Sequence, residues 1–247
     1  CWKNQIAPLV AAGYRVIMPD QRGYNRSEKP SGVFQYQITY LIKDIIALLD
    51  FLGYKKVFLA AHDWGAIVGW FLGIYHADRI ERMVVMNVPH PMVMEQFLFK
   101  SPRQILRSWY TFLFQIPFLP EWFITRNSGL TMARVLQMTG LKNSFDDQQM
   151  ELYREAWCQP GAATGMINWY RAAFRYRKSI PRDQHKVLVP TKLIWGKKDI
   201  ALMHQMTGPS IELCENGELE ILEEASHWVI HDASDRVNQI LLEWFSK

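Results

Sequence analysis

Short apolar runs alternate with longer stretches of helical periodicity along most of this chain. Five runs have consecutive apolar residues or an excess of Val and Ile, as strands buried on both faces do; they span residues 14–19, 56–61, 83–88, 191–195 and 218–222. Apolar residues recur at helical spacing in residues 36–52, 66–76 and 236–245. Alternation of strand and helix predicts an α/β fold built on a mostly parallel, doubly wound sheet.

Residues 91–186 break this alternation, because they contain no run of strand type. The segment is rich in aromatic residues at helical spacing, as in RQILRSWYTFLFQ and GMINWYRAAFRYR. It is too long for a structureless loop. We therefore expect a helical insertion between the third and fourth predicted strands, with a sheet-bearing core formed by residues 1–90 and 187–247.

Composition and charge narrow the class of protein. A chain of 247 residues that is 49% apolar can bury one substantial core. A net charge of +4, with acids and bases interleaved, does not indicate a nucleic-acid partner. Three cysteines without CxxC spacing predict neither a disulfide framework nor a zinc site and favour a reducing, cytoplasmic setting. No apolar run approaches the roughly 18 residues that a membrane span needs.

The sharpest local pattern is Ala61-His62-Asp63-Trp64-Gly65, at the junction of a predicted strand and a predicted helix. A nucleophile elbow needs small residues two positions either side of the reactive one, because its sharp turn brings backbones together. Ala61 and Gly65 meet that demand, with aspartate in the central position. Taken alone, an aspartate at the end of a strand is more often a helix cap than a nucleophile.

Two further residues favour the nucleophile. Asp199 follows the fourth predicted strand in WGKKD, and His227 follows the fifth in ASHW. Either alone fits a structural role, as a turn aspartate or a buried histidine. However, a triad on a parallel sheet of this kind runs in the order nucleophile, acid, histidine, and its members lie at the carboxyl ends of strands. Asp63, Asp199 and His227 satisfy both conditions and together predict a catalytic triad.

The motifs HDWGA, NVPHP, WGKKD, ASHW and PDQRGYNRSEKP resemble those of the epoxide-hydrolase branch of the α/β-hydrolases, and the resemblance covers essentially the whole chain. It implies the α/β-hydrolase fold with residues 91–186 as a helical cap. It also implies that two cap tyrosines activate the epoxide: Tyr110, five residues before Gln-x-Pro, and Tyr170, in a Trp-Tyr-Arg segment. Without the resemblance, these tyrosines would be interpreted as amphipathic packing residues.

An aspartate nucleophile suits attack at a saturated carbon, which leaves an alkyl ester on the enzyme. Attack on an ester would give an anhydride, so the substrate class narrows to epoxides or alkyl halides. Tyr110 and Tyr170 would donate a proton to the epoxide oxygen. His227, oriented by Asp199, would activate the water that hydrolyses the ester.

The backbone N–H of Trp64 is expected to stabilise the oxyanion of that hydrolysis. Trp64, Phe114 and Trp228 are expected to line the substrate pocket. The partners expected are a small hydrophobic epoxide and water, with no metal or organic cofactor required. The identity of the epoxide and the oligomeric state stay open.

Two other functions fit the elbow aspartate. A haloalkane dehalogenase also uses aspartate followed by tryptophan, and it binds halide through N–H groups such as those of Trp109, Trp157 or Trp169. The matching cap tyrosines favour the epoxide over the halide. A receptor-like, non-catalytic α/β-hydrolase is the second alternative, against which the intact triad argues. A truncated, inactive α/β-hydrolase is a further alternative, which depends on the expected absence of the upstream strands.

The beginning of the chain raises a further expectation. Cys1 and Trp2 open directly onto a predicted helix, KNQIAPLVAAG. In the family that the motifs resemble, a His-Gly-x-Pro segment with the second oxyanion donor precedes this point, as do the first strands of the sheet. We expect a fragment or an incomplete gene model, lacking a strand between residues 14–19 and 56–61; whether an upstream membrane anchor exists stays open.

Overall fold

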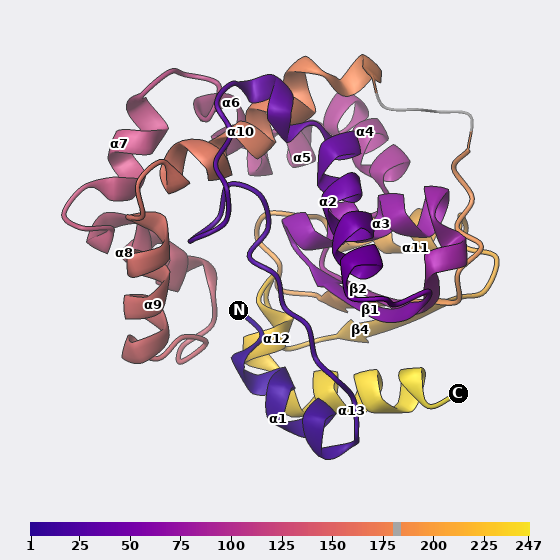
Figure 1. The fold of residues 1–247 in the computed structure, drawn as a ribbon. Helices are drawn as coiled ribbons and strands as arrows, with labels where there is room; N and C mark the ends of the chain where they lie inside the picture. The colour runs from indigo at the N-terminus through magenta and orange to yellow at the C-terminus, as the bar shows by residue number, and fades with distance from the viewer. Residues whose placement is uncertain (180–183) are drawn as a thin grey trace. The chain divides into compact units, whose positions relative to one another are not determined.

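One parallel sheet organises the residues that the computed structural model describes, 1–179 and 184–247 (Figure 1). Its four strands, in spatial order, are β1 (Val57–His62), β2 (Ile80–Met86), β3 (Thr191–Gly196) and β4 (Gly217–Leu222). Val85 of β2 is in register with Ala61 of β1 and Leu193 of β3. The predicted parallel sheet is confirmed, and the carboxyl ends of its strands meet at one edge.

The prediction of a strand at residues 14–19 was wrong, since this segment forms none. An apolar run becomes a strand only where a neighbour accepts and donates its backbone hydrogen bonds. Among the described residues β1 pairs with β2 alone, so no ladder reaches this segment. Its first amide, that of Tyr14, instead donates to the carbonyl of Leu9 and closes the end of the first helix.

The chain divides into two compact units. The sheet unit consists of Cys1–Met18, Gly53–Arg107 and the described residues 184–247, and the helical unit consists of Pro19–Leu52 and residues 108–179. The helices of the sheet unit are α1 (Lys3–Ala11), α3 (Trp64–Tyr75), α4 (Pro91–Lys100), α5 (Pro102–Arg107), α11 (Thr207–Ile211), α12 (Val229–Asp232) and α13 (Ser234–Phe245), with 3-10 turns η2 (Ala77–Arg79) and η4 (His204–Met206).

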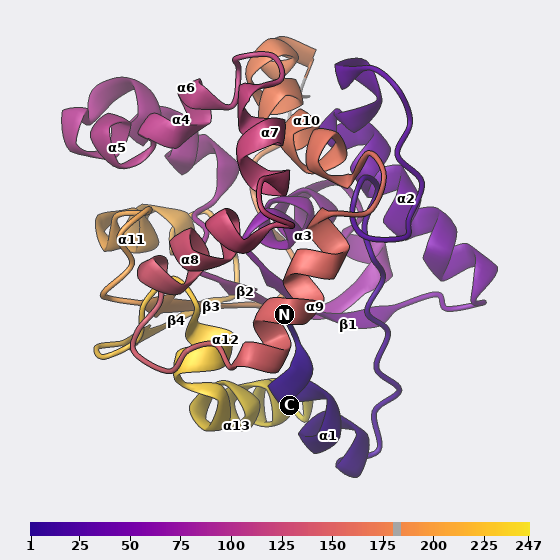
Figure 2. The ribbon, with the colours of Figure 1, turned by 90° about the vertical axis from the view of Figure 1, so that its left-hand side faces the viewer.

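Helices cover both faces of the sheet, as the doubly wound prediction requires. Side chains alternate along β2: Met83 and Val85 pack on one face with α3, whereas Val84 and Met86 pack on the other with α1 and α13. Both views place α1 and α13 on one side of the sheet and α3 and α11 on the other (Figures 1 and 2). The edge formed by the carboxyl ends of the strands is therefore backed by two buried cores.

The helical unit contains no strand among its described residues. Its elements are η1 (Val33–Tyr36), α2 (Ile38–Phe51), α6 (Trp109–Leu113), α7 (Leu119–Thr125), α8 (Leu130–Thr139), α9 (Asp147–Trp157), α10 (Ala162–Arg175) and η3 (Arg177–Ser179). The predicted helices at 36–52, 66–76 and 236–245 are confirmed as α2, α3 and α13. No helix in the described part of the chain is long and apolar enough to cross a membrane.

The loop of residues 20–28, from the PDQRGYNRSEKP motif, packs on helix α10 within the helical unit. Gly165 of α10 approaches Gly23 so closely that a Cβ at residue 165 would lie 2.6 Å from the carbonyl oxygen of Gly23. The indole N–H of Trp169 donates to the carbonyl of Arg22 over 2.9 Å. Arg22 in turn makes two 2.7 Å hydrogen bonds to the carboxylate of Asp44 on α2. This motif therefore fixes the helix that carries Tyr170.

Candidate active site

Asp63 occupies the sharp turn between β1 and α3. Its backbone has φ 51° and ψ −130°, a conformation that non-glycine residues rarely adopt and that costs on the order of 1–3 kcal/mol. The turn is tightly packed, since a Cβ at Gly69 on α3 would lie 3.0 Å from the Cβ of Ala61. Although Asp63 stands at the N-cap position, its side chain makes no capping hydrogen bond. The carboxylate is therefore available for other contacts, and 45% of the side chain is exposed.

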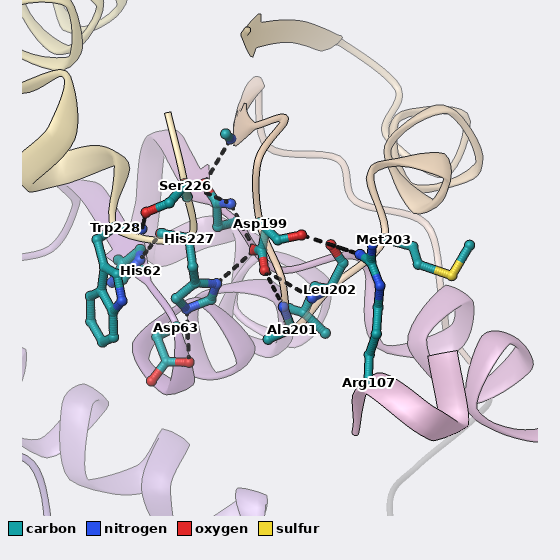
Figure 3. Close-up of polar contacts among 12 residues, drawn as sticks. His62, Asp63, Arg107, Asp199, Ala201, Leu202, Met203, Ser226, His227 and Trp228 are labelled. Carbon is teal, nitrogen blue, oxygen red and sulfur yellow. Dashed lines mark hydrogen bonds and ion pairs between the residues drawn. The ribbon is translucent and has the colours of Figure 1, made fainter. Parts of the chain in front are cut away.

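His227 stands between the two carboxylates that the sequence singled out (Figure 3). Its Nδ1 lies 2.7 Å from Oδ2 of Asp199, and its Nε2 lies 3.4 Å from Oδ1 of Asp63. The three residues come from the carboxyl ends of β1, β3 and β4, as the order of the motifs indicates. The fold thus brings Asp63 together with Asp199 and His227, which both lie more than a hundred residues further along the chain.

The carboxylate of Asp199 is fully enclosed and fully hydrogen-bonded. Its Oδ1 accepts from the amides of Ala201 and Leu202, at 2.8 and 2.9 Å. Its Oδ2 accepts from the side-chain amide of Asn87 at 2.8 Å and pairs with His227. Since its side chain has no exposed surface, these four partners hold Asp199 in one orientation toward His227.

Asn87 and Gly196 allow the loop that carries Asp199 and the loop that carries His227 to approach each other. Asn87 follows β2 with φ 51°, and its Oδ1 accepts from the amide of Gly196 at 3.0 Å while its amide donates to Asp199. A Cβ at Gly196 would lie 1.9 Å from the carbonyl oxygen of Ser226. Only glycine at the end of β3 therefore lets the loop that carries His227 pass against the loop that carries Asp199.

Helix α5 holds the Asp199 loop from its other side. The buried side chain of Gln104 donates to the carbonyl of Ala201 at 2.8 Å and accepts from the amide of Met203 at 3.1 Å. The guanidinium of Arg107 donates to the carbonyl of Asp199 at 3.2 Å (Figure 3). These bonds satisfy backbone groups that a tight loop would otherwise leave unpaired.

The residue before Asp63 also reaches His227. Nε2 of His62 lies 2.8 Å from the backbone oxygen of His227, and the two imidazole centroids are 5.0 Å apart. Burial lowers the pKa of His62 to about 4, and the neighbouring charge of His227 lowers it as well. His62 is consequently neutral at pH 7, with its proton on Nε2 because a carbonyl oxygen only accepts.

The charges of the site favour a protonated His227. Burial lowers the pKa of this imidazole, but the charge of Asp199 and the hydrogen bonds to Asp199 and Asp63 outweigh burial and raise the pKa to about 10. Desolvation raises the pKa of Asp63, but the hydrogen bond and charge of His227 bring it below its ordinary value. Asp199 behaves likewise, with its pKa lowered by His227 against the effect of burial. These shifts all favour the carboxylate–imidazolium–carboxylate form of the array.

The family model of the alpha/beta hydrolase fold matches residues 1–234. The chain belongs to the α/β-hydrolase family.

Two relatives match nearly the whole of this α/β-hydrolase. The AB hydrolase superfamily protein YfhM of Bacillus subtilis is 40% identical over 98% of this chain and 84% of its own length. Epoxide hydrolase 4 of Mus musculus is 34% identical over 97% of this chain and 67% of its own length. The chain therefore spans about two thirds of the mouse relative.

A solved structure shows the same fold. The Bacillus megaterium epoxide hydrolase in complex with an inhibitor superposes with a TM-score of 0.90 at 27% identity, covering 100% of this chain and 88% of that one. The predicted α/β-hydrolase fold is confirmed by this likeness and by the family match.

The remaining predicted site residues lie in both units of this α/β-hydrolase. In the sheet unit, the backbone N–H of Trp64 hydrogen-bonds to Asp63, and the Trp228 ring centroid is 5.3 Å from that of His227. In the helical unit, three aromatic rings form one cluster: Phe114 is 4.7 Å and Tyr110 6.1 Å from Tyr170. No group of three or more His, Cys, Asp or Glu side chains in the described part of the chain is arranged to hold a metal ion.

Sequence reasoning missed three residues of the α/β-hydrolase site: His62, Asn87 and Gly196. A signal for each was present. Asn87 follows a parallel strand just as Asp63 and Asp199 do, and Gly196 lies within WGKKD. His62 is covalently adjacent to Asp63, but nothing in its position along the sequence indicates that it reaches residue 227.

Proposed function

We propose that this α/β-hydrolase converts hydrophobic epoxides to vicinal diols through an ester between the substrate and Asp63. One observation carries the proposal: a strained elbow presents a carboxylate to Nε2 of His227 at 3.4 Å, while Nδ1 of the same ring is held by Asp199. The names of the relatives and of the solved structure support the substrate class.

In the first step, the ionised carboxylate of Asp63 attacks an epoxide carbon and the ring C–O bond breaks. The lowered pKa of Asp63 favours this step, because the nucleophile is charged at neutral pH. The departing oxygen takes a proton from Tyr110 or Tyr170, which we assign to the cap inferred for residues 91–186. The ring centroids of Tyr110 and Tyr170 are 6.1 Å apart, so both phenols belong to one cluster and can serve one oxygen.

In the second step, formation of the ester changes the task of His227. Asp63 loses its charge on alkylation, so one of the two carboxylates that raise the pKa of His227 disappears. The imidazolium then releases its proton, which passes through solvent to the tyrosinate left by the first step, and His227 becomes a base at neutral pH. It takes a proton from a water molecule whose oxygen attacks the ester carbonyl, while Asp199 keeps the ring oriented.

The tetrahedral intermediate then places negative charge on the former carboxyl oxygen of Asp63. The backbone N–H of Trp64 already hydrogen-bonds to that carboxylate and is positioned to stabilise the charge. Collapse of the intermediate breaks the ester C–O bond. The diol oxygen takes the proton held by His227, and the new carboxyl group of Asp63 then gives its own proton to the freed imidazole, which restores the resting carboxylate and imidazolium.

The packing of Trp169 weighs against a haloalkane dehalogenase. Its indole N–H, one candidate for halide binding, donates to the carbonyl of Arg22, and its side chain is 1% exposed. That N–H therefore has a structural partner inside the helical unit. Release of chloride or bromide from a haloalkane, without diol formation from any epoxide, would reverse the choice.

A single turnover in ¹⁸O-labelled water tests the mechanism, with enzyme in excess over styrene oxide. Water attacks the ester carbonyl, so the label must appear in the Asp63 peptide while the first diol stays unlabelled. A labelled first diol would mean direct attack of water on the epoxide and would overturn the proposal. Asp63→Ala is the matched control and must form no diol; a receptor-like protein would still bind its ligand with this substitution.

A further inference from the structure

His62 joins the nucleophile strand to the loop that carries the base. Its Nε2–H donates to the carbonyl of His227 over 2.8 Å, and its side chain is buried. The centroid of its ring lies 5.0 Å from that of His227 and 5.6 Å from that of Trp228. Because His62 directly precedes Asp63, one side-chain hydrogen bond ties the residue before the proposed nucleophile to the backbone of the proposed base (Figure 3).

We propose that His62 is a positioning residue that fixes the peptide of His227, so that Nε2 of His227 meets the water which hydrolyses the Asp63 ester. This inference rests on the proposed function. His62 touches neither the epoxide nor the water; it acts through His227.

A positioning residue is needed because His227 lies in a loop. His227 lies between β4 and α12, outside any strand, so no ladder hydrogen bond holds its backbone. The preceding residue is fixed by Asp232, whose Oδ2 accepts from the amide of Ser226 at 2.8 Å. The bond from His62 ties the carbonyl of His227 directly to β1, and the amide of Trp228 in the same peptide donates to Oγ of Ser226 at 3.2 Å. A displacement of about 1 Å at a catalytic base costs on the order of 10²-fold in rate, so this tie affects chemistry.

The positive charge of His227 favours an uncharged hydrogen-bond donor at residue 62. His227 carries a positive charge in the resting enzyme, and a second cation 5 Å away would repel it. A neutral imidazole with its proton on Nε2 supplies a hydrogen bond without charge. The low pKa of His62, which burial and the charge of His227 produce, keeps it in that form at neutral pH.

Two substitutions separate the hydrogen bond from the shape of the side chain. Glutamine places an amide N–H about as far from the backbone as the imidazole Nε2–H, whereas leucine removes the donor. We expect His62→Leu to slow ester hydrolysis about 10- to 100-fold, while ester formation stays within about 3-fold of wild type. His62→Gln should recover most of the loss.

The measurement is rapid quench of the enzyme with styrene oxide, followed by intact-protein mass analysis for the alkyl-enzyme. With His62→Leu the ester should accumulate and kcat and KM should fall together, because only the second step is slowed. Unchanged ester hydrolysis in the leucine variant would overturn the positioning role. So would failure of glutamine to restore it. If the leucine variant does not fold, His62→Asn, whose amide is too short to reach the carbonyl, gives the same comparison.

Two controls keep the inference separate from the proposed function. His227→Gln removes the base and must trap the ester; if no ester appears even there, the proposed function fails whatever His62 does. His90→Leu removes another buried histidine of the sheet unit, whose Nδ1 accepts from the amide of Met92. It should lower the unfolding temperature without ester accumulation. Accumulation in that variant too would show that general loosening, not the bond to His227, controls ester hydrolysis.

Discussion

Nε2 of His227 lies 3.4 Å from Oδ1 of Asp63, whereas Nδ1 of the same ring lies 2.7 Å from Oδ2 of Asp199. Hydrogen bonds between charged groups usually measure about 2.7–2.9 Å, so His227 is held firmly by one carboxylate and loosely by the other. This asymmetry suits the two proposed roles. Asp199 must keep its bond throughout the reaction, and Asp63 must exchange its contact with His227 for one with substrate.

The charge of Asp63 should be measurable at His227. Replacing Asp63 with Asn removes one of the carboxylates that hold the pKa of His227 near 10, so that pKa should fall. NMR titration of ¹⁵N-labelled imidazole signals in wild type and variant gives both values. An equal pKa in the two proteins would mean that Asp199 alone sets the protonation of His227.

Substitutions of Asn87 test how much its hydrogen bonds to Asp199 and Gly196 stabilise the protein. Asn87→Ala leaves the amide of Gly196 and one lone pair of Asp199 without a hydrogen bond, which should lower the free energy of unfolding by about 1–3 kcal/mol. The alanine also adds backbone strain, because residue 87 has φ 51°. Asn87→Gly loses the same bonds without that strain. Urea denaturation should find the alanine variant less stable than the glycine variant by about 1 kcal/mol. Equal stabilities would show that the backbone at residue 87 relaxes freely.

Gly196 should not tolerate a methyl group. In Gly196→Ala the new Cβ would lie 1.9 Å from the carbonyl oxygen of Ser226, so the loops that carry Asp199 and His227 must separate. We expect loss of diol formation and a stability loss of more than about 3 kcal/mol, as in other severe backbone clashes. The control is Gly208→Ala in α11, where a Cβ meets nothing within 4 Å and the protein should be unaffected or slightly stabilised.

Gly165→Ala tests the contact between α10 and the loop of residues 20–28. The new Cβ would lie 2.6 Å from the carbonyl oxygen of Gly23, and backbone cannot yield as a side chain does. If Tyr170 on α10 is a proton donor, its displacement should slow ester formation about 10-fold or more and leave ester hydrolysis unchanged. Rapid quench distinguishes the two steps. Thr164→Ala, at an exposed position of the same helix, should change neither rate.

His62 should impose a pH dependence on stability. Its pKa is about 4 in the folded protein and near 6.5 in the unfolded chain, so between these values the unfolded chain binds the extra proton. The free energy of unfolding should therefore rise with pH across this window, by up to about 3 kcal/mol from this residue. Glutamine does not titrate, so the difference between wild type and His62→Gln should grow from pH 4 to 6.5 and then level off. A constant difference in urea denaturation would contradict a neutral, buried His62.

The order and chemistry of the candidate site follow from the sequence. Strands buried on both faces are continuous apolar runs, and four of the five strands predicted from such runs are present in the structure. Because the carboxyl ends of parallel strands share one edge, Asp63, Asp199 and His227 were expected to meet there. An aspartate at the elbow restricts the proposed reaction to attack at a saturated carbon. This restriction depends on the chemistry of the nucleophile and not on the detailed geometry of the site.

Only the tertiary structure decided what holds those residues in place. Residues 14–19 have the composition of a strand but pair with nothing described, because a strand depends on its neighbour as well as on its own side chains. The link from His62 to residue 227, and the close approach of Gly196 to Ser226, join segments that are distant in the sequence. Periodicity reports which face of an element is buried. It carries no information on which distant backbone atom a buried histidine or glycine will meet, and those contacts set the distance between nucleophile and base.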